Sequence, residues 1–268
     1  EMISGEAGMG ELREIRLEDL LRRDPIQLDF DQITGYIAGK TVLITGANRG
    51  IGLALTHACL RRDDQVIACC RDPYHARALH QLSEIYPSLS IHQLDVSRGE
   101  DYLELKHAIG DQVIDLLIAN AGVLGPQLQG FGQVDYHAWA EVFAINSMAP
   151  LRLAEHFFDN LKDSERRTLV CISSIMGSID LNQEGGSYLY RSSKAALNAV
   201  VKSMAIDLAG DGVHVLAIHP GWVKTQMGGE GAVVEADECA VTLLETLDRL
   251  PAGTSGQFLS YDGKPLTW

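Results

Sequence analysis

The chain has 268 residues, of which 46% are hydrophobic and 22% are charged, and its formal net charge is −14. A chain of this length and composition can bury a full hydrophobic core, as a globular protein does. The negative charge excludes nucleic acid and anionic membranes as expected partners, because the few arginine pairs are too scattered to form a basic patch.

From Lys40 onward, short apolar runs alternate with patterns of helical period. The sequence predicts strands over residues 41–45, 65–70, 89–95, 113–120, 168–174 and 213–220, and a last strand near 256–261. It predicts helices over residues 50–62, 73–86, 98–110, 134–161 and 187–210, and a last helix near 237–249; the second has a proline in its first turn and the third ends at a glycine. This alternation predicts an α/β fold: a Rossmann-type, doubly wound parallel sheet of about seven strands with helices on both faces.

The segment TGANRGIG, from Thr45 to Gly52, follows the first predicted strand and opens the first predicted helix. In a doubly wound sheet, this turn lies at the edge where ligands bind. Gly46 and Gly50 allow the backbone to turn sharply beside a pyrophosphate, and Gly52 allows the helix to pack closely on the sheet. Because a strand precedes the pattern and a helix follows it, we predict a dinucleotide-binding turn.

The end of the second strand indicates which dinucleotide binds. An acidic residue there would favour NAD, but this strand ends at Cys70 and is followed by Arg71. Arg49 lies inside the glycine turn, and two guanidinium groups near the ribose suit a 2′-phosphate. The sequence therefore predicts NADP(H), although an ion pair between Asp72 and Arg71 would weaken the preference.

Tyr190 and Lys194 are four residues apart in a predicted helix, so both side chains can point into one cleft. An unperturbed tyrosine has a pKa of about 10, and a lysine charge at about 4 Å favours tyrosinate by roughly three pKa units. The pair therefore predicts general acid–base catalysis near neutral pH. Other polar residues occur with it in order: Asn120 ends the fourth strand, Asn146 lies in the following helix, and Ser174 ends the fifth strand.

On these residues, the chain from about Lys40 to Trp268 resembles the short-chain dehydrogenase/reductase family. TGANRGIG resembles the family's T-G-x-x-x-G-x-G, and Asn120, Ala121 and Gly122 match its N-A-G. Ser174, Tyr190 and Lys194 match its catalytic set, with Asn146 as the fourth member. The stretches YRSSKAALNAVVKSM, HPGWVKTQMGG and YDGKPLTW are most similar to C-factor and Sniffer-type carbonyl reductases, and the interval from Ser174 to Tyr190 is slightly longer than is usual in the family.

The resemblance implies that the chain reduces an aldehyde, ketone or quinone with NADPH. Tyr190 would donate a proton to the carbonyl oxygen, and Ser174 would hold that oxygen by a hydrogen bond. Lys194 would lower the tyrosine pKa and bind the nicotinamide ribose, while Asn146 would hold a water that relays protons to Lys194. The cofactor-binding residues that the resemblance and the glycine turn imply are Gly46, Asn48, Arg49, Gly50, Ile51, Gly52, Arg71, Asp95, Val96, Asn120, Ala121, Gly122, Tyr190, Lys194, Pro220, Gly221, Val223 and Thr225.

The sequence gives a less specific signal for the substrate pocket than for the cofactor site. Trp222, Met227 and the glycine-rich stretch 228–231 suggest an apolar pocket with a mobile lid, but an exposed loop explains them almost as well. The resemblance also implies that the chain can form a homodimer through its long central helices. A non-catalytic NADP-binding signalling protein is an alternative, against which the intact Ser174, Tyr190 and Lys194 set argues.

Residues 1–39 do not belong to the family's usual start. Residues 11–40 resemble the segment before the nucleotide-binding domain of nucleotide-sugar dehydratases and epimerases, which supplies a second alternative function. We therefore divide the chain into an extension of short helices over residues 1–39 and an NADP-binding domain over residues 40–268.

The five cysteines and nine histidines form no C-x-x-C, H-E-x-x-H or ligand cluster, so we expect buried thiols and no metal. No run is long enough to predict a transmembrane helix, and no signal peptide is visible, which predicts a cytoplasmic protein.

Overall fold

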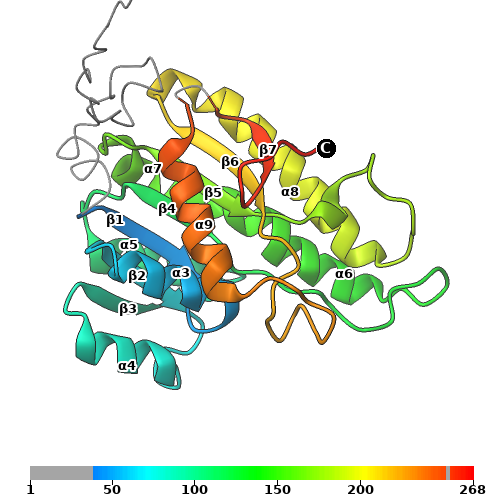
Figure 1. The fold of residues 1–268 in the computed structure, drawn as a ribbon, viewed down its shortest axis with the longest axis horizontal. Helices are drawn as coiled ribbons and strands as arrows, with labels where there is room; N and C mark the ends of the chain where they lie inside the picture. The colour runs from blue at the N-terminus through cyan, green and yellow to red at the C-terminus, as the bar shows by residue number, and fades with distance from the viewer. Residues whose placement is uncertain (1–38, 252–253) are drawn as a thin grey trace, which may run out of the picture. The chain divides into compact units, whose positions relative to one another are not determined.

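The computed structural model describes residues 39–251 and 254–268, so the predicted extension over residues 1–39 lies almost entirely outside the described residues. Seven strands form one sheet in the order β3-β2-β1-β4-β5-β6-β7, and every neighbouring pair is parallel (Figure 1). This order reverses between β1 and β4 and confirms the predicted doubly wound fold. The strands are β1 (Thr41–Thr45), β2 (Gln65–Cys70), β3 (Leu89–Gln93), β4 (Leu116–Ala119), β5 (Thr168–Ile172), β6 (His214–His219) and β7 (Gln257–Ser260).

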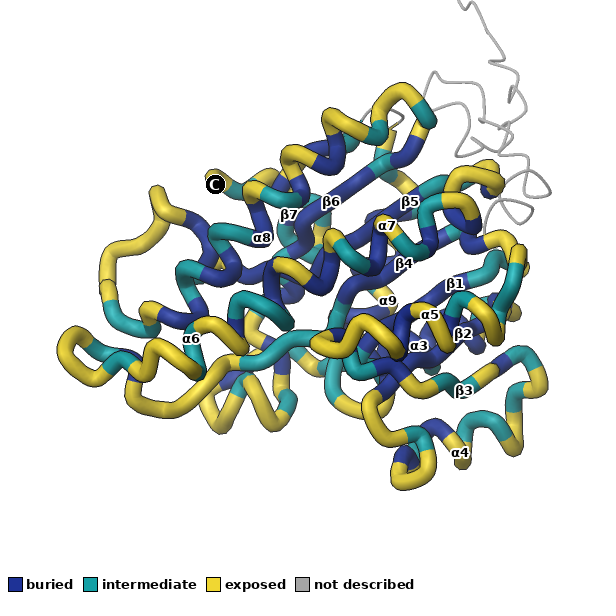
Figure 2. Tube along the Cα trace, turned by 180° about the vertical axis from the view of Figure 1, so that it is seen from behind, coloured by how far each residue is buried: buried dark blue, intermediate teal, exposed yellow. Residues whose placement is uncertain are grey.

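Helices cover both faces of the sheet, which is why the strands are apolar along most of their length. In Figure 1, α3 (Gly50–Leu60) and α9 (Ala236–Arg249) lie in front of the sheet, and Val42 and Ile44 of β1 belong to the core on this face. Figure 2, the view from behind, shows α5 (Gly99–Ile109), α7 (Ala149–Lys162) and α8 (Tyr188–Asp207) over buried strands. Leu43 of β1 belongs to the core on this second face.

The helix predicted over residues 73–86 begins later in the structure. α4 spans Arg77–Ile85, and Pro73 lies in the turn before it rather than in its first turn. The Asp72 carboxylate accepts a hydrogen bond from the His75 N–H at 3.2 Å and lies 2.6 Å from the His75 ring, while the Ala76 N–H donates to the Pro73 carbonyl at 3.1 Å. This turn satisfies the backbone groups locally, so the helix does not start until Arg77.

The helix predicted over residues 134–161 consists of three consecutive segments. α6 (Tyr136–Phe143) leads into a π-helical turn, η1 (Ala144–Met148), from which α7 continues. Asp135 caps α6 by accepting hydrogen bonds from the N–H groups of His137 and Ala138 at 2.9 and 3.1 Å. Single π-helical turns are rare in proteins, but those that occur are often found at functional sites. This one contains Asn146.

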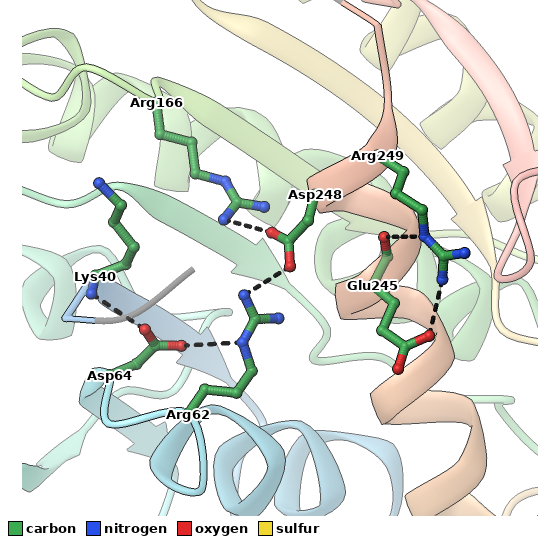
Figure 3. Close-up of polar contacts among 7 residues, drawn as sticks. All are labelled: Lys40, Arg62, Asp64, Arg166, Glu245, Asp248 and Arg249. Atoms are coloured by element: carbon green, nitrogen blue, oxygen red, sulfur yellow. Dashed lines mark hydrogen bonds and ion pairs between the residues drawn. The ribbon is translucent and has the colours of Figure 1, made fainter. Parts of the chain in front are cut away.

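A cluster of charged side chains ties the amino-terminal edge of the sheet to the ends of α3 and α9 (Figure 3). Arg62 and Arg166 both form ion pairs with Asp248, at 2.7 and 3.0 Å. Asp64 accepts a hydrogen bond from the Lys40 N–H at 3.1 Å and lies 3.9 Å from Arg62. Burial raises the pKa of Asp64 to about 6. The cluster lies at the edge opposite to the predicted site and has a structural role.

Three properties of residues 39–251 and 254–268 bear on function. No helix among them is both long and apolar enough to cross a membrane. No group of three or more His, Cys, Asp or Glu side chains among them is placed to hold a metal ion. All five cysteines are buried free thiols.

Candidate active site

The glycine turn after β1 has a shape that larger residues would disrupt. Gly46 and Gly50 have φ angles of 66° and 54°, in the left-handed region that favours glycine. A Cβ on Gly52 would lie 2.3 Å from the Gly46 carbonyl oxygen, far inside van der Waals contact. No side chain caps the start of α3, since the guanidinium of Arg49, the residue before it, has no acceptor atom, so the first N–H groups of α3 can bind an anion.

Asn120 supports this turn from the end of β4. Its side-chain NH₂ donates to the carbonyl oxygens of Thr45 and Gly46 at 2.9 and 3.3 Å. The Thr45 hydroxyl oxygen in turn accepts hydrogen bonds from the N–H groups of Asn120 and Ala121, both at 3.0 Å. Asn120 is therefore part of the frame of the turn, and Thr45, which the sequence analysis did not single out, joins the two strand ends.

The loop after β6 lies against the same turn. Arg49 donates to the Gln226 side-chain oxygen at 2.8 Å, and a Cβ on Gly50 would lie 3.3 Å from the Thr225 methyl carbon. Gln226 was not predicted, because nothing near it in the sequence indicates a partner 177 residues away. Of the other predicted residues in this loop, Gly221 has a φ of 83°, the Pro220 carbonyl accepts from the Cys239 thiol at 3.1 Å, and Val223 is buried.

Arg71 lies at the exposed end of β2. It lines an open hollow of about 600 Å³ whose other walls are Asp72, Pro73, Tyr74, His80, Ile91 and Gln93. The Asp72 carboxylate lies 2.6 Å from the His75 ring, and no ion pair joins it to Arg71 in the described part of the chain. The contact of Asp72 with His75 therefore replaces the ion pair with Arg71 that was expected to weaken the preference for a 2′-phosphate.

Two of the predicted cofactor-binding residues, Asp95 and Val96, follow β3. The Asp95 carboxylate accepts hydrogen bonds from the N–H and hydroxyl of Ser97, at 3.0 and 2.7 Å. Val96 is buried and lines a small cavity with Ala121 and six other residues of β1, β4, η1 and α7. Of the remaining predicted contacts, Asn48 is exposed at the tip of the glycine turn and Ile51 packs against the core.

Ser174, Tyr190 and Lys194 come together where β5 ends and α8 begins. Tyr190 and Lys194 are 8% and 5% exposed, so the pair lies within the protein rather than on its surface. The Lys194 ammonium donates to the Ile172 carbonyl at 2.8 Å and lies 5.8 Å from the centre of the Tyr190 ring. Ser174 forms a side-chain hydrogen bond with Tyr190 and accepts another from the Met176 N–H at 3.2 Å.

The pKa of Tyr190 departs from the expectation. Burial raises it, and the hydrogen bond with Ser174 offsets that rise only in part. Burial also lowers the pKa of Lys194 to about 8. The predicted fall of the tyrosine pKa is therefore wrong for the chain alone. The Lys194 ammonium lies over the ring and donates to the Ile172 carbonyl, so the desolvation of Tyr190 determines the direction of its pKa shift.

Asn146 is engaged on both sides of its amide. Its oxygen accepts from the Val123 N–H at 2.9 Å, and its NH₂ donates to the Val123 carbonyl and the Ser193 hydroxyl at 2.8 and 3.0 Å. Ser193 then donates to the Tyr190 carbonyl at 2.8 Å. A Cβ on Gly122 would lie 3.2 Å from the Asn146 oxygen and 3.6 Å from the Lys194 nitrogen. Asn146 thus connects the loop after β4 to α8, while its water-relay role stays a prediction.

Two aromatic residues, Trp222 and Trp268, organise the loops that follow β6 and β5. Trp222 donates to the Gly228 carbonyl at 2.7 Å, and its ring would lie 2.5 Å from a Cβ on Gly231, so the glycine-rich stretch packs around this ring. Trp268 stacks on Phe258 with 5.7 Å between ring centres. The Trp268 main-chain oxygen accepts hydrogen bonds from the Ser178 hydroxyl and the Ile179 N–H, both at 3.1 Å. Trp268 therefore anchors the loop that leads from Ser174 to Tyr190, a role the sequence analysis missed.

Residues 40–232 match the family model described as short chain dehydrogenase. Among curated proteins, the C-signal protein of Myxococcus xanthus is 41% identical over 155 residues, which cover 58% of this chain and 93% of that protein. Among solved structures, the carbonyl reductase Sniffer of D. melanogaster superposes with a TM-score of 0.81 at 32% identity, covering 86% of this chain and all of that one. An NADPH-bound carbonyl reductase from chicken fatty liver superposes with a TM-score of 0.80 at 33% identity over the same share of this chain and all of its own.

Proposed function

The chain belongs to the short chain dehydrogenase family of oxidoreductases, and on this premise we propose that it reduces an apolar carbonyl compound with NADPH, with Tyr190 as the proton donor. The observation that carries the proposal is the buried set of Ser174, Tyr190 and Lys194 at the sheet edge that also carries the glycine turn. We also propose that residues 40–268 form the catalytic domain, with residues 1–39 as an appended segment.

The glycine turn fits a dinucleotide. Side chains at Gly46, Gly50 and Gly52 would fill the space in which the backbone and the start of α3 can face a pyrophosphate. Arg71, at the exposed end of β2, supplies positive charge on the side where a 2′-phosphate would lie, which favours NADPH over NADH, whereas the Arg49 guanidinium is bonded to Gln226 in the loop after β6. The NADPH in the chicken structure, which is 33% identical to this chain, supports this choice. When bound, NADPH supplies the hydride for the carbonyl carbon.

The protein side chains would handle the proton. Because burial raises the pKa of Tyr190, the phenol is protonated near neutral pH and can donate to a carbonyl oxygen that becomes an alkoxide. Ser174, already bonded to Tyr190, can hold the same oxygen. A protonated Lys194 at 5.8 Å from the ring centre would stabilise the resulting tyrosinate by about 3 kcal/mol at an effective dielectric constant of about 20.

The substrate side is proposed to be apolar. Loops after β4, β5 and β6 carry large apolar side chains that are exposed in the chain alone. They are Leu124, Leu128 and Phe131 after β4, Ile175, Ile179 and Leu181 after β5, and Trp222, Met227 and Val233 after β6. An apolar substrate would cover such side chains, whereas a small polar substrate would leave them in water.

A second candidate is a signalling role through partner binding, without turnover. The likeness to the C-signal protein favours it, but that likeness covers only 58% of this chain. The residues that resemble nucleotide-sugar dehydratases lie outside the described part, apart from residues 39 and 40, so that alternative rests on the sequence only.

The test measures NADPH oxidation, and separately NADH oxidation, with a panel of apolar aldehydes, diketones and quinones. Tyr190→Phe is expected to lower kcat by about 10²- to 10⁴-fold without changing the Kd for NADPH. Tyr86→Phe, at the residue that follows α4 and outside the predicted site, is the matched control and should behave like the wild type. Turnover that survives Tyr190→Phe would refute the proposed proton donor. Tight NADPH binding with no turnover of any substrate would favour the signalling role, and UDP-sugars would then be tried as ligands.

A further inference from the structure

The helix that carries Tyr190 begins without an ordinary cap. Ser187 precedes α8 with a φ of 44° and makes no side-chain capping hydrogen bond, and Gly185 and Gly186 before it also have positive φ angles, 65° and 63°. The first N–H groups of a helix have no partner within the helix and need acceptors from elsewhere. At α8 these groups include the N–H of Tyr190 itself.

Gln129, in the loop after β4, supplies those acceptors. Its side-chain oxygen accepts a hydrogen bond from the Tyr190 N–H at 3.1 Å, and its main-chain oxygen accepts one from the Tyr188 N–H at 3.3 Å. The side chain is 8% exposed, so water competes little for these bonds. A residue 61 positions upstream thus takes the place of the helix cap beneath Tyr190.

The nitrogen of the same amide holds the turn that follows β4. It donates to the Leu124 and Pro126 carbonyl oxygens at 2.7 and 2.8 Å. Gly125, between them, has a φ of 83°, and a Cβ there would lie 2.9 Å from Val142 of α6. Both sides of the amide are used, so its orientation is determined and no other side chain of this size can make all three bonds.

We propose that Gln129 is a positioning residue for Tyr190, which couples the substrate-side loop around Leu124 to the first turn of α8. The inference rests on the proposed function, since it assigns a role in the transfer of the Tyr190 proton. It predicts that loss of the amide displaces the phenol from Ser174 and lowers kcat, while the cofactor turn after β1 is unaffected. Proton transfer is sensitive to such displacement, because catalysis requires near-ideal placement of the donor.

The first experiment compares Gln129→Met, which keeps the length of the side chain but loses its hydrogen bonds, with Gln127→Met as the matched control. Gln127 lies in the same loop and is exposed. For Gln129→Met we expect kcat to fall by about tenfold, the change that corresponds to the single lost hydrogen bond to the Tyr190 N–H, with the Kd for NADPH unchanged. A wild-type kcat in a variant whose melting temperature falls would show a purely structural role and overturn the proposal.

Amide hydrogen exchange of residues 188–190 gives a readout that needs no substrate. We expect exchange in Gln129→Met to be at least about tenfold faster than in the wild type, and unchanged in Gln127→Met. Failure of the wild type to reduce any carbonyl compound would refute the proposed function, whereas unchanged exchange would refute the role of Gln129. Should Gln129→Met not fold, Gln129→Glu keeps an acceptor for the Tyr190 N–H but not the two donors. In Gln129→Glu, exchange at residue 190 as slow as in the wild type together with a reduced kcat would support the coupling. A wild-type kcat in this variant would overturn it.

Discussion

Replacing Gly52 with alanine should damage the cofactor turn, and the structure indicates by how much. The new methyl group would lie 2.3 Å from the Gly46 carbonyl oxygen and 2.6 Å from the Asn120 side-chain nitrogen. Both atoms belong to the frame of the turn, because Asn120 donates to the Gly46 carbonyl. The turn or α3 must therefore move by about 1 Å to restore ordinary contact distances.

Two effects of this substitution oppose each other. Overpacking of this kind costs about 1–3 kcal/mol, whereas alanine in place of glycine inside a helix contributes about 0.5–1 kcal/mol of stability. The overpacking is the larger effect, because the closest clash is with the Gly46 backbone and the Asn120 side chain is held by its own hydrogen bonds. We expect the free energy of unfolding to fall by about 1–2 kcal/mol and the Kd for NADPH to rise by about tenfold or more.

Urea unfolding and fluorescence titration with NADPH measure the two quantities. Gly99→Ala is the control: it is also at the start of a helix, α5, but a Cβ there would meet no atom within 4 Å. This control should be at least as stable as the wild type and bind NADPH equally well. A Gly52→Ala protein with wild-type stability and wild-type NADPH affinity would refute the packing argument.

Two other predictions concern stability and specificity. Because the folded-state pKa of Asp64 is raised to about 6, the folded chain holds that proton more tightly than the unfolded chain, so this carboxyl lowers stability as the pH rises from about 4 to about 6. Asp64→Asn should flatten the pH dependence of urea unfolding in that window, and an unchanged slope would contradict the assignment. Trp268→Ala should loosen the loop after Ser174 and raise the KM for the carbonyl substrate by about tenfold at an unchanged NADPH Kd. Trp268→Phe should keep the KM near that of the wild type, because a phenylalanine can still stack on Phe258. Equal KM values in the two variants would argue against an anchoring role.

The sequence by itself determined the fold and the residue types at the site. Strands buried on both faces must be apolar along their length, and the runs from TVLIT to GQFLSY show this apart from the half-exposed edge strand β3, so the seven-stranded sheet could be predicted. The glycine turn is equally local, since the positive φ angles at Gly46 and Gly50 arise within eight residues of sequence. Tyr190 and Lys194 share one helix, so helical spacing alone predicted that they point in one direction.

Only the tertiary structure decided how these residues are held. The cap beneath Tyr190 comes from Gln129, and the partner of Arg49 is Gln226, 177 residues away, and no local pattern encodes such pairs. The start of α4 depended on a hydrogen-bonded turn that competes with the helix. The pKa of Tyr190 was predicted in the wrong direction because it depends on burial, and burial is a property of how distant segments pack around a side chain.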